Sequence, residues 1–196
     1  DPDSRQWTMK DYCDPEHPLQ RMIAEEIASF TGEPVGTSGI DGCGAPVAAV
    51  SALGLARAYS TLGTAIRNMD ADARASTVAT AMVDYPELIQ APGMPDTVLS
   101  EQLDAVVKSG AAGVLCVGLR SGASVVVKIS DGATRAAYPV ALWALEATGH
   151  LPSEQVQQLL PQVTRPVIGG VQDNAPRKVG GWVPGADLEP LVGENA

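Results

Sequence analysis

The sequence has few aromatic residues, no cluster of positive charge and no long hydrophobic run. Aromatic residues make up 4% of the 196 residues, so a core has to be built from alanine, valine, leucine and isoleucine. Lysine and arginine total 13 against 23 aspartate and glutamate residues, which leaves a net charge of −10. An acidic chain of this kind repels phosphate backbones and anionic lipid surfaces. We therefore expect neither nucleic acid nor a membrane as a partner.

No apolar run approaches the roughly 20 residues that a membrane-spanning helix needs. The three cysteines, at positions 13, 43 and 116, contain no CxxC pair and are odd in number, which argues against a secreted disulfide framework. We therefore expect a reducing compartment, the cytoplasm. The chain begins at Asp1 with neither an initiator methionine nor a signal-peptide pattern, which suggests that a segment is missing upstream.

The first hundred residues carry helical periodicity. Apolar residues spaced three or four apart predict a helix over residues 15–31, capped by Asp14. An alanine-rich helix that is apolar nearly all round, and so buried, is expected over residues 46–62. A third helix is expected over residues 70–83. The glycine-rich stretch at residues 38–45 is expected to be a loop.

After residue 100 the pattern changes to short β-branched runs. "DAVVKSG", "GVLCVGL" and "SVVVKIS" predict three adjacent antiparallel strands. A covering helix is expected over residues 133–147, then a short helix capped by Ser153, then "RPVIGG" as an edge strand and a glycine-rich tail. The expected fold is α+β, with a helical block at residues 1–100 and the sheet, covering helix and tail at residues 101–196.

The stretch "VVKSGAAG", residues 106–113, could carry chemistry. Lys108 and Ser109 place an ammonium and a hydroxyl on one strand, and Gly110 lets a ligand approach the backbone. Such a set could bind a carboxylate and an oxyanion. The alternative is a lysine that protects an edge strand, followed by an ordinary turn. Lys128, in "VVVKISDG", alternates onto the more polar face of its strand, where a solvated lysine is the simpler interpretation.

The stretch "SGIDGCGAPV", residues 38–47, puts one thiol among glycines. Flanking glycines keep Cys43 accessible, and Asp41 offers an anionic acceptor. The alternative is a tight turn with an Asx hydrogen bond and a small buried cysteine. Cys116 has apolar neighbours and is expected in the core. Cys13 and His17 have the spacing of two metal ligands on a helix, but the prolines around them argue against a continuous helix.

These stretches together resemble one enzyme family. "SGIDGCGAPV", with "CDPEHPLQ" before it and "VVKSGAAGVLCVGL…VVVKISDGATRAAYPVALWAL" after it, closely resembles the bacterial L-asparaginases of the rhizobial type, the asparaginase II family. The resemblance runs from Tyr12 to His150 and covers the later part of such an enzyme. It implies a serine β-lactamase-like or glutaminase-like fold, here without its N-terminal segment.

The family's nucleophile is a serine of an SxxK motif, assisted by a second serine–lysine pair. A Cys-Ser-Gly-Lys-His stretch contributes to a zinc site. Neither SxxK nor that stretch occurs in this sequence. The resemblance implies that Cys43 is a zinc ligand and Asp41 an active-site carboxylate beside it. One cysteine leaves the zinc site incomplete, since zinc takes three or four protein ligands.

The resemblance also implies roles for the strand residues. Lys108 would pair with the second serine and hold developing charge. Ser109 and the backbone N–H of Ala111 would flank the substrate's carboxylate and oxyanion. Lys128 is the other candidate for the family's active-site lysine, and we expect Lys108 and Cys43 to converge on a common cleft.

The resemblance implies the C-terminal portion of an L-asparagine amidohydrolase that works through a seryl acyl-enzyme. The chain alone is expected to be inactive, because the SxxK serine is absent. One alternative is a stand-alone module of the same ancestry that binds a small ligand without catalysis. Another is a fragment that associates with the missing N-terminal portion or forms a homodimer, because the apolar helix at residues 46–62 needs partners. The sequence leaves asparagine and glutamine open as substrates.

Overall fold

The computed structural model describes residues 7, 10–36, 38–172 and 175–185. The chain divides into two compact units, residues 1–58 and 59–196, and each is described by itself. Near residue 100 the secondary structure changes from helices to strands, as the sequence indicated. The interpretation of this position as a domain boundary stays a prediction.

The first unit contains α1 (Pro18–Thr31), β1 (Ser38–Ile40), β2 (Pro46–Ala48) and the beginning of α2 (Ala52–Ala65). The predicted cap of α1 is wrong, because His17 and not Asp14 caps the helix. The Nδ1 atom of His17 accepts the N–H of Leu19 at 3.1 Å. Pro18 then occupies the first helical position, where a missing N–H costs no hydrogen bond.

The glycine-rich stretch is a short hairpin and not the predicted loop. β1 and β2 pair antiparallel with Ile40 opposite Pro46, so Pro46 cannot open a helix. Helix α2 begins after Ser51, whose hydroxyl accepts the N–H of Gly54 at 2.9 Å. The Ser51 hydroxyl in turn donates to Glu33 at 2.8 Å, and the hydrogen bonds from Ser51 lower the pKa of Glu33. These side chains set the start of α2.

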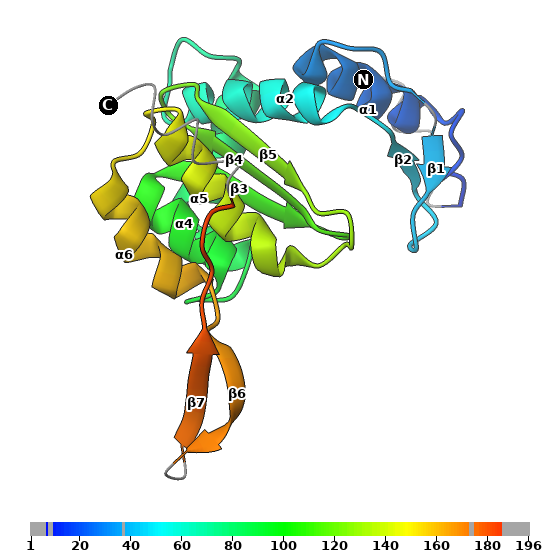
Figure 1. Ribbon diagram of the computed structural model, residues 1–196. Coiled ribbons are helices and arrows are strands. Elements are labelled where there is room, and N and C mark those ends of the chain that lie inside the picture. The colour runs from blue at the N-terminus through cyan, green and yellow to red at the C-terminus, as the bar shows by residue number, and fades with distance from the viewer. Residues whose placement is uncertain (1–6, 8–9, 37, 173–174, 186–196) are drawn as a thin grey trace. The chain divides into compact units, whose positions relative to one another are not determined.

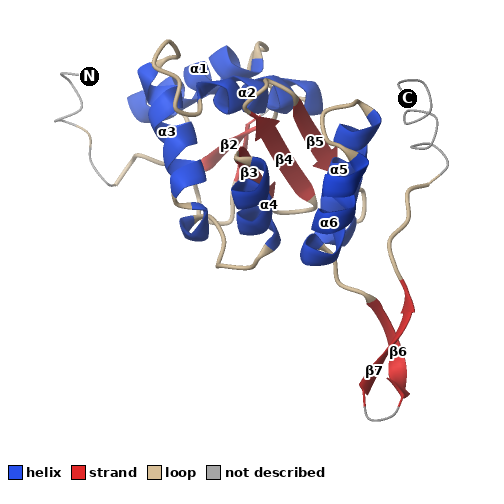
Figure 2. Cartoon of the chain, turned by 90° about the vertical axis from the view of Figure 1, so that its left-hand side faces the viewer, coloured by secondary structure: helices blue, strands red, loops and turns tan. Residues whose placement is uncertain are grey.

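The second unit is built on an antiparallel sheet in the order β3-β4-β5, as predicted. Its elements are α3 (Ala73–Asp84), a 3-10 turn (Pro86–Leu88), α4 (Pro95–Leu103), β3 (Ala105–Gly110), β4 (Val114–Leu119), β5 (Ser124–Lys128), a second 3-10 turn (Thr134–Ala136), α5 (Ala137–Ala147) and α6 (Ser153–Val163). Helices α4 and α5 contact the sheet, and α6 packs against both of them (Figures 1 and 2).

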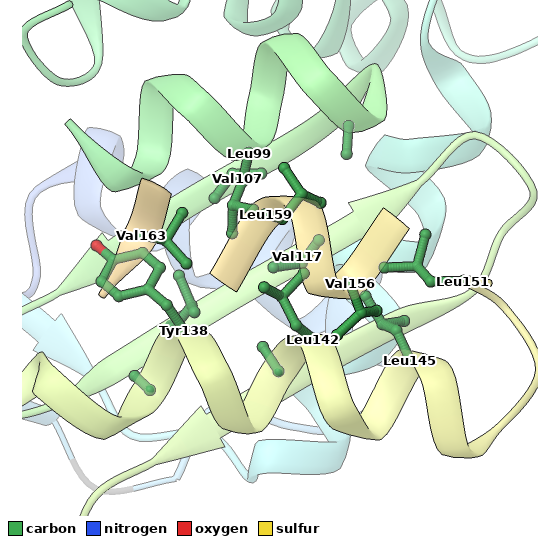
Figure 3. Close-up of a cluster of buried hydrophobic side chains, with 14 of the residues drawn as sticks. Leu99, Val107, Val117, Tyr138, Leu142, Leu145, Leu151, Val156, Leu159 and Val163 are labelled. Atoms are coloured by element: carbon green, nitrogen blue, oxygen red, sulfur yellow. The ribbon is translucent and has the colours of Figure 1, made fainter. Parts of the chain in front are cut away.

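The core lies between one sheet face and these helices (Figure 3). Val107 and Val117 come from the sheet, Leu142 from α5 and Leu159 from α6, and each is at most 2% exposed. All four are small or medium apolar residues, as the low aromatic content requires. The covering helix predicted over residues 133–147 is therefore confirmed, although its regular part begins after the second 3-10 turn.

The later part of α2 packs on the opposite sheet face. A Cβ at Gly118 would overlap the carbonyl oxygen of Tyr59, and a Cβ at Gly63 would overlap that of Leu119, so glycine is what permits this close approach. The expectation that α2 is buried all round is wrong. Leu53 is 60% exposed on the same helix.

The end of the second unit departs from the predicted pattern. Ser153 is the first residue of α6 rather than its cap, and Pro152 precedes it without a side-chain bond. The predicted edge strand is β6 (Val167–Gln172), which pairs with β7 (Ala175–Gly180) in a sheet separate from β3-β4-β5. The predicted tail thus contains a strand. All residues of β7 are exposed.

The observed class is α+β with small antiparallel sheets, as predicted. None of the helices in the described part of the chain has the length and apolarity to cross a membrane.

Candidate active site

The Asp41–Cys43 stretch forms the turn between β1 and β2. The backbone of Asp41 bonds to Ala45 and Gly44, and its Oδ1 accepts the N–H of Gly42 at 2.8 Å. The Cys43 thiol is exposed and lies 3.7 Å from Asp41 Oδ2. The site therefore combines features of both interpretations, an Asx turn and an accessible thiol beside a carboxylate. The N–H groups of Gly42 and Gly44 donate hydrogen bonds to Asp41 and not to the sulfur of Cys43.

Two cysteines approach Tyr12 in this unit. The pKa of the Tyr12 hydroxyl is raised, first by its hydrogen bond with the Cys13 side chain and less by the charges of Cys13 and Cys43. This neighbourhood was missed in the sequence, where Cys13 was considered only with His17. His17 is 8% exposed, and the lone pair of its Nδ1 accepts a hydrogen bond that caps α1. That nitrogen is therefore not available as a metal ligand.

The residues present do not complete a zinc site. Asp41 and Cys43 supply two donors, whereas zinc takes three or four protein ligands. Among the described residues, no three His, Cys, Asp or Glu side chains are grouped so as to hold a metal ion.

Lys108 and Lys128 share one face of the sheet. Lys108 on β3 lies opposite Cys116 of β4, and Lys128 on β5 lies opposite Val114 of β4. Directly paired residues point to the same face, and so do residues two apart on one strand. Both exposed ammonium groups therefore rise from the face opposite the core, one on each side of β4. The alternation of polar and apolar residues along a single strand could not show that Lys108 and Lys128 share a face.

Backbone carbonyls hold both ammonium groups near the β3–β4 turn. Lys128 Nζ donates to Ala112 O at 2.5 Å and to Ile129 O at 3.1 Å. Lys108 Nζ donates to Ser109 O. Ala111 lies exposed in the same turn, where Ala112 has a φ of 56°. Two cations thus lie beside exposed backbone at this turn.

Cys116 lies between these lysines and is 4% exposed. Burial raises the pKa of its thiol to about 11, and the positive charge of Lys108 opposes that shift only in part. The thiol is therefore neutral at physiological pH, as expected for a buried cysteine and not for a nucleophile.

Ser109 faces the other way. Its N–H and its hydroxyl both donate to Asp96 Oδ2, at 2.9 and 2.8 Å, and Tyr138 Oη donates to Asp96 Oδ1 at 2.9 Å. Asp96 is 1% exposed, so these three hydrogen bonds satisfy a buried carboxyl group. The structure therefore places Lys108 and Lys128 on one face of the sheet. The Ser109 hydroxyl lies on the opposite face and donates to Asp96.

Asp96 was not singled out from the sequence. It stands in the first turn of α4 directly after Pro95, a place where acidic residues favour helix formation. That signal predicts a helix start, but not the contact with Ser109. Cys43 belongs to the first unit and Lys108 to the second, so their common cleft stays a prediction.

The sequence matches the family described as L-asparaginase II over residues 3–178. Among curated proteins no significant match was found. The matched range includes the Asp41–Cys43 turn and both lysines of the sheet face. Because the match extends over most of its length, this chain belongs to the L-asparaginase II family.

Proposed function

We propose that this chain is the C-terminal portion of an L-asparagine amidohydrolase, and that it does not turn over asparagine by itself. Membership of the L-asparaginase II family over residues 3–178 carries the proposal. The absence of an SxxK serine from the sequence supports the second part. The complete enzyme would convert L-asparagine and water to L-aspartate and ammonia.

The chemistry requires positive charge at the carbonyl oxygen. A serine hydroxyl attacks the side-chain amide carbon, the C–N bond breaks, and ammonia leaves with the serine proton. Water then hydrolyses the ester to aspartate. Each step places negative charge on the former carbonyl oxygen, which positioned cations stabilise. We assign this role to Lys108 and Lys128, because the two cations lie on one sheet face.

The proposal also includes the type of fold, a zinc site and the localisation of the protein. The antiparallel sheet with helices on one face and α2 on the other is compatible with a serine β-lactamase-like fold. Zinc at Cys43 would need ligands beyond Asp41, supplied from outside the described residues. Cytoplasmic localisation is proposed from the sequence, whose three cysteines are odd in number and contain no CxxC pair.

Ammonia release tests the proposal. The 196-residue chain is expected to release none from L-asparagine or L-glutamine. A longer chain that includes a leading segment from the same reading frame, with its SxxK serine, is expected to hydrolyse asparagine. Replacing that serine with alanine should abolish the activity. Turnover by the 196-residue chain that Lys108→Ala removes would contradict the proposal.

Calorimetry separates the proposal from a stand-alone binding module. An incomplete active site should give little heat with asparagine and none that saturates. Saturable heat that disappears in Lys108→Ala would favour a binding module at the lysine face. Light scattering on the chain alone measures whether it forms a homodimer, and light scattering on its mixture with the leading segment measures their association.

A further inference from the structure

The second unit contains a cavity on the helix-covered side of the sheet. Its volume is about 530 Å³, and it is lined by the loop before α4, the beginning of α5, the end of α6 and the chain after β7. Tyr138 and Val163 lie at this end of the core (Figure 3). A cavity of a few hundred cubic ångströms is the size that holds a small organic molecule.

The lining is cationic in an acidic protein. Arg135 and Arg165 line the cavity, and no aspartate or glutamate does, although the sequence contains 23 acidic residues and only 13 basic ones. The polar groups beside the arginines are neutral, from Gln90, Tyr138 and Gln162. The cavity therefore favours a negatively charged guest.

The two arginines differ in their availability. Arg135 Nη2 lies 2.6 Å from Asp131 Oδ2, so its guanidinium is already paired with a carboxylate. Arg165 makes no ion pair with any residue in the described ranges of the chain. A planar guanidinium with free donors binds a carboxylate through two parallel hydrogen bonds. Arg165 is thus the group that can take the charged end of a ligand.

A polar floor and an aromatic wall complete the cavity. Tyr138 is 6% exposed, and its hydroxyl is already bound to Asp96, while Gln90 Oε1 accepts the N–H of Asp96 at 2.8 Å. The floor is therefore held in place before any ligand arrives. Trp182 is half-buried and lines one wall, where its indole can contact the apolar part of a ligand.

We propose that this cavity is a binding site for a small carboxylate, with Arg165 binding the carboxylate group and Trp182 contacting the remainder of the molecule. The site is separate from the lysine face, since Tyr138 lies on the core side of the sheet and Lys108 on the other. The proposal does not depend on the asparaginase function.

The indole N–H signals of the ¹⁵N-labelled chain test the proposal. The sequence has three tryptophans, and the signal of Trp182 is assigned by its loss in Trp182→Phe. The probes are succinate and benzoate, each compared with its uncharged amide, succinamide or benzamide. We expect at least one carboxylate to shift the Trp182 signal saturably, and its amide to leave the signal in place.

Arg165→Gln is expected to weaken that carboxylate's binding at least tenfold, about what one lost charge-assisted contact gives. Arg177→Gln is the matched control, because Arg177 is an exposed arginine on β7 outside the cavity lining. It should leave the binding unchanged, and the remaining amide signals verify that each variant is folded. Equal shifts with acid and amide, no shift with either carboxylate, or unchanged binding in Arg165→Gln would overturn the proposal.

Discussion

Lys108 and Lys128 lie on the same face of the central sheet, at the end where β3 turns into β4. They occupy the two outer strands, with Val114 and Cys116 of β4 between them. Either lysine alone is an ordinary exposed side chain. Together they form a local concentration of positive charge on a chain whose net charge is −10.

Both lysines should matter in the complete enzyme. Lys108→Met and Lys128→Met are each expected to lower kcat/KM by about 10²–10³, the usual loss when one group that stabilises an oxyanion is removed. Lys178→Met on the exposed strand β7 is the control and should be fully active. Full activity of Lys128→Met beside an inactive Lys108→Met would show that one lysine suffices and that the shared face is not the catalytic feature.

The three thiols should differ in reactivity. Cys43 is exposed, Cys13 is partly exposed and Cys116 is buried. Brief treatment of the native chain with iodoacetamide should therefore modify Cys43 first and leave Cys116 unmodified, because a reactive thiol needs both access and ionisation. Peptide mass spectrometry measures the extent at each site. In urea all three should be modified, and early labelling of Cys116 in the native chain would contradict its burial.

Stability should fall at alkaline pH because of Cys116. Burial raises the pKa of its thiol from 9.0 to about 11, so above pH 9 the unfolded chain loses this proton while the folded chain retains it. The resulting stabilisation is complete below pH 9 and is lost as the pH rises through 11. Urea unfolding from pH 8 to 11 measures this decline.

Cys116→Ala is the comparison for this decline. The variant lacks the thiol and should lose less stability over the same range, even though it starts lower because a buried atom has been removed. Burial also raises the pKa of Tyr138, to about 12, so some decline should remain in both proteins. Parallel curves for the two proteins would show that the Cys116 thiol does not titrate differently on folding.

The contact between α2 and β4 requires glycine. Gly118→Ala should lower the free energy of unfolding by about 1–3 kcal/mol or more, since the added methyl group overlaps the Tyr59 carbonyl and rigid backbone must move. Gly181→Ala is the control, because a Cβ there meets nothing within 4 Å. Urea denaturation compares the two. A Gly118→Ala variant as stable as Gly181→Ala would mean that α2 does not pack on β4.

Much of the secondary structure could be predicted from local patterns. The three strands were predicted because β-branched runs were separated by glycine-containing turns. Helix α3 was predicted because its segment begins with acidic residues, and in the structure Asp72 caps it with two hydrogen bonds. Two errors, at the caps of α1 and α6, were local, whereas the start of α2 and the place of Pro46 depend on contacts with residues farther along the chain. Glu33 is hydrogen-bonded to Ser51 and so sets the start of α2. Pro46 lies in β2, which pairs with β1 in a hairpin.

The sequence by itself determined the class of fold, the three-stranded sheet and the family, because these depend on residue types and their order. Only the tertiary structure decided which side chains meet. Strand pairing put Lys108 and Lys128 on one face, and the packing of α4 and α5 placed Asp96 and Tyr138 against Ser109 on the other. The physical reason is that the register between strands and the docking of helices are set by contacts between residues far apart in the chain, which no local pattern contains.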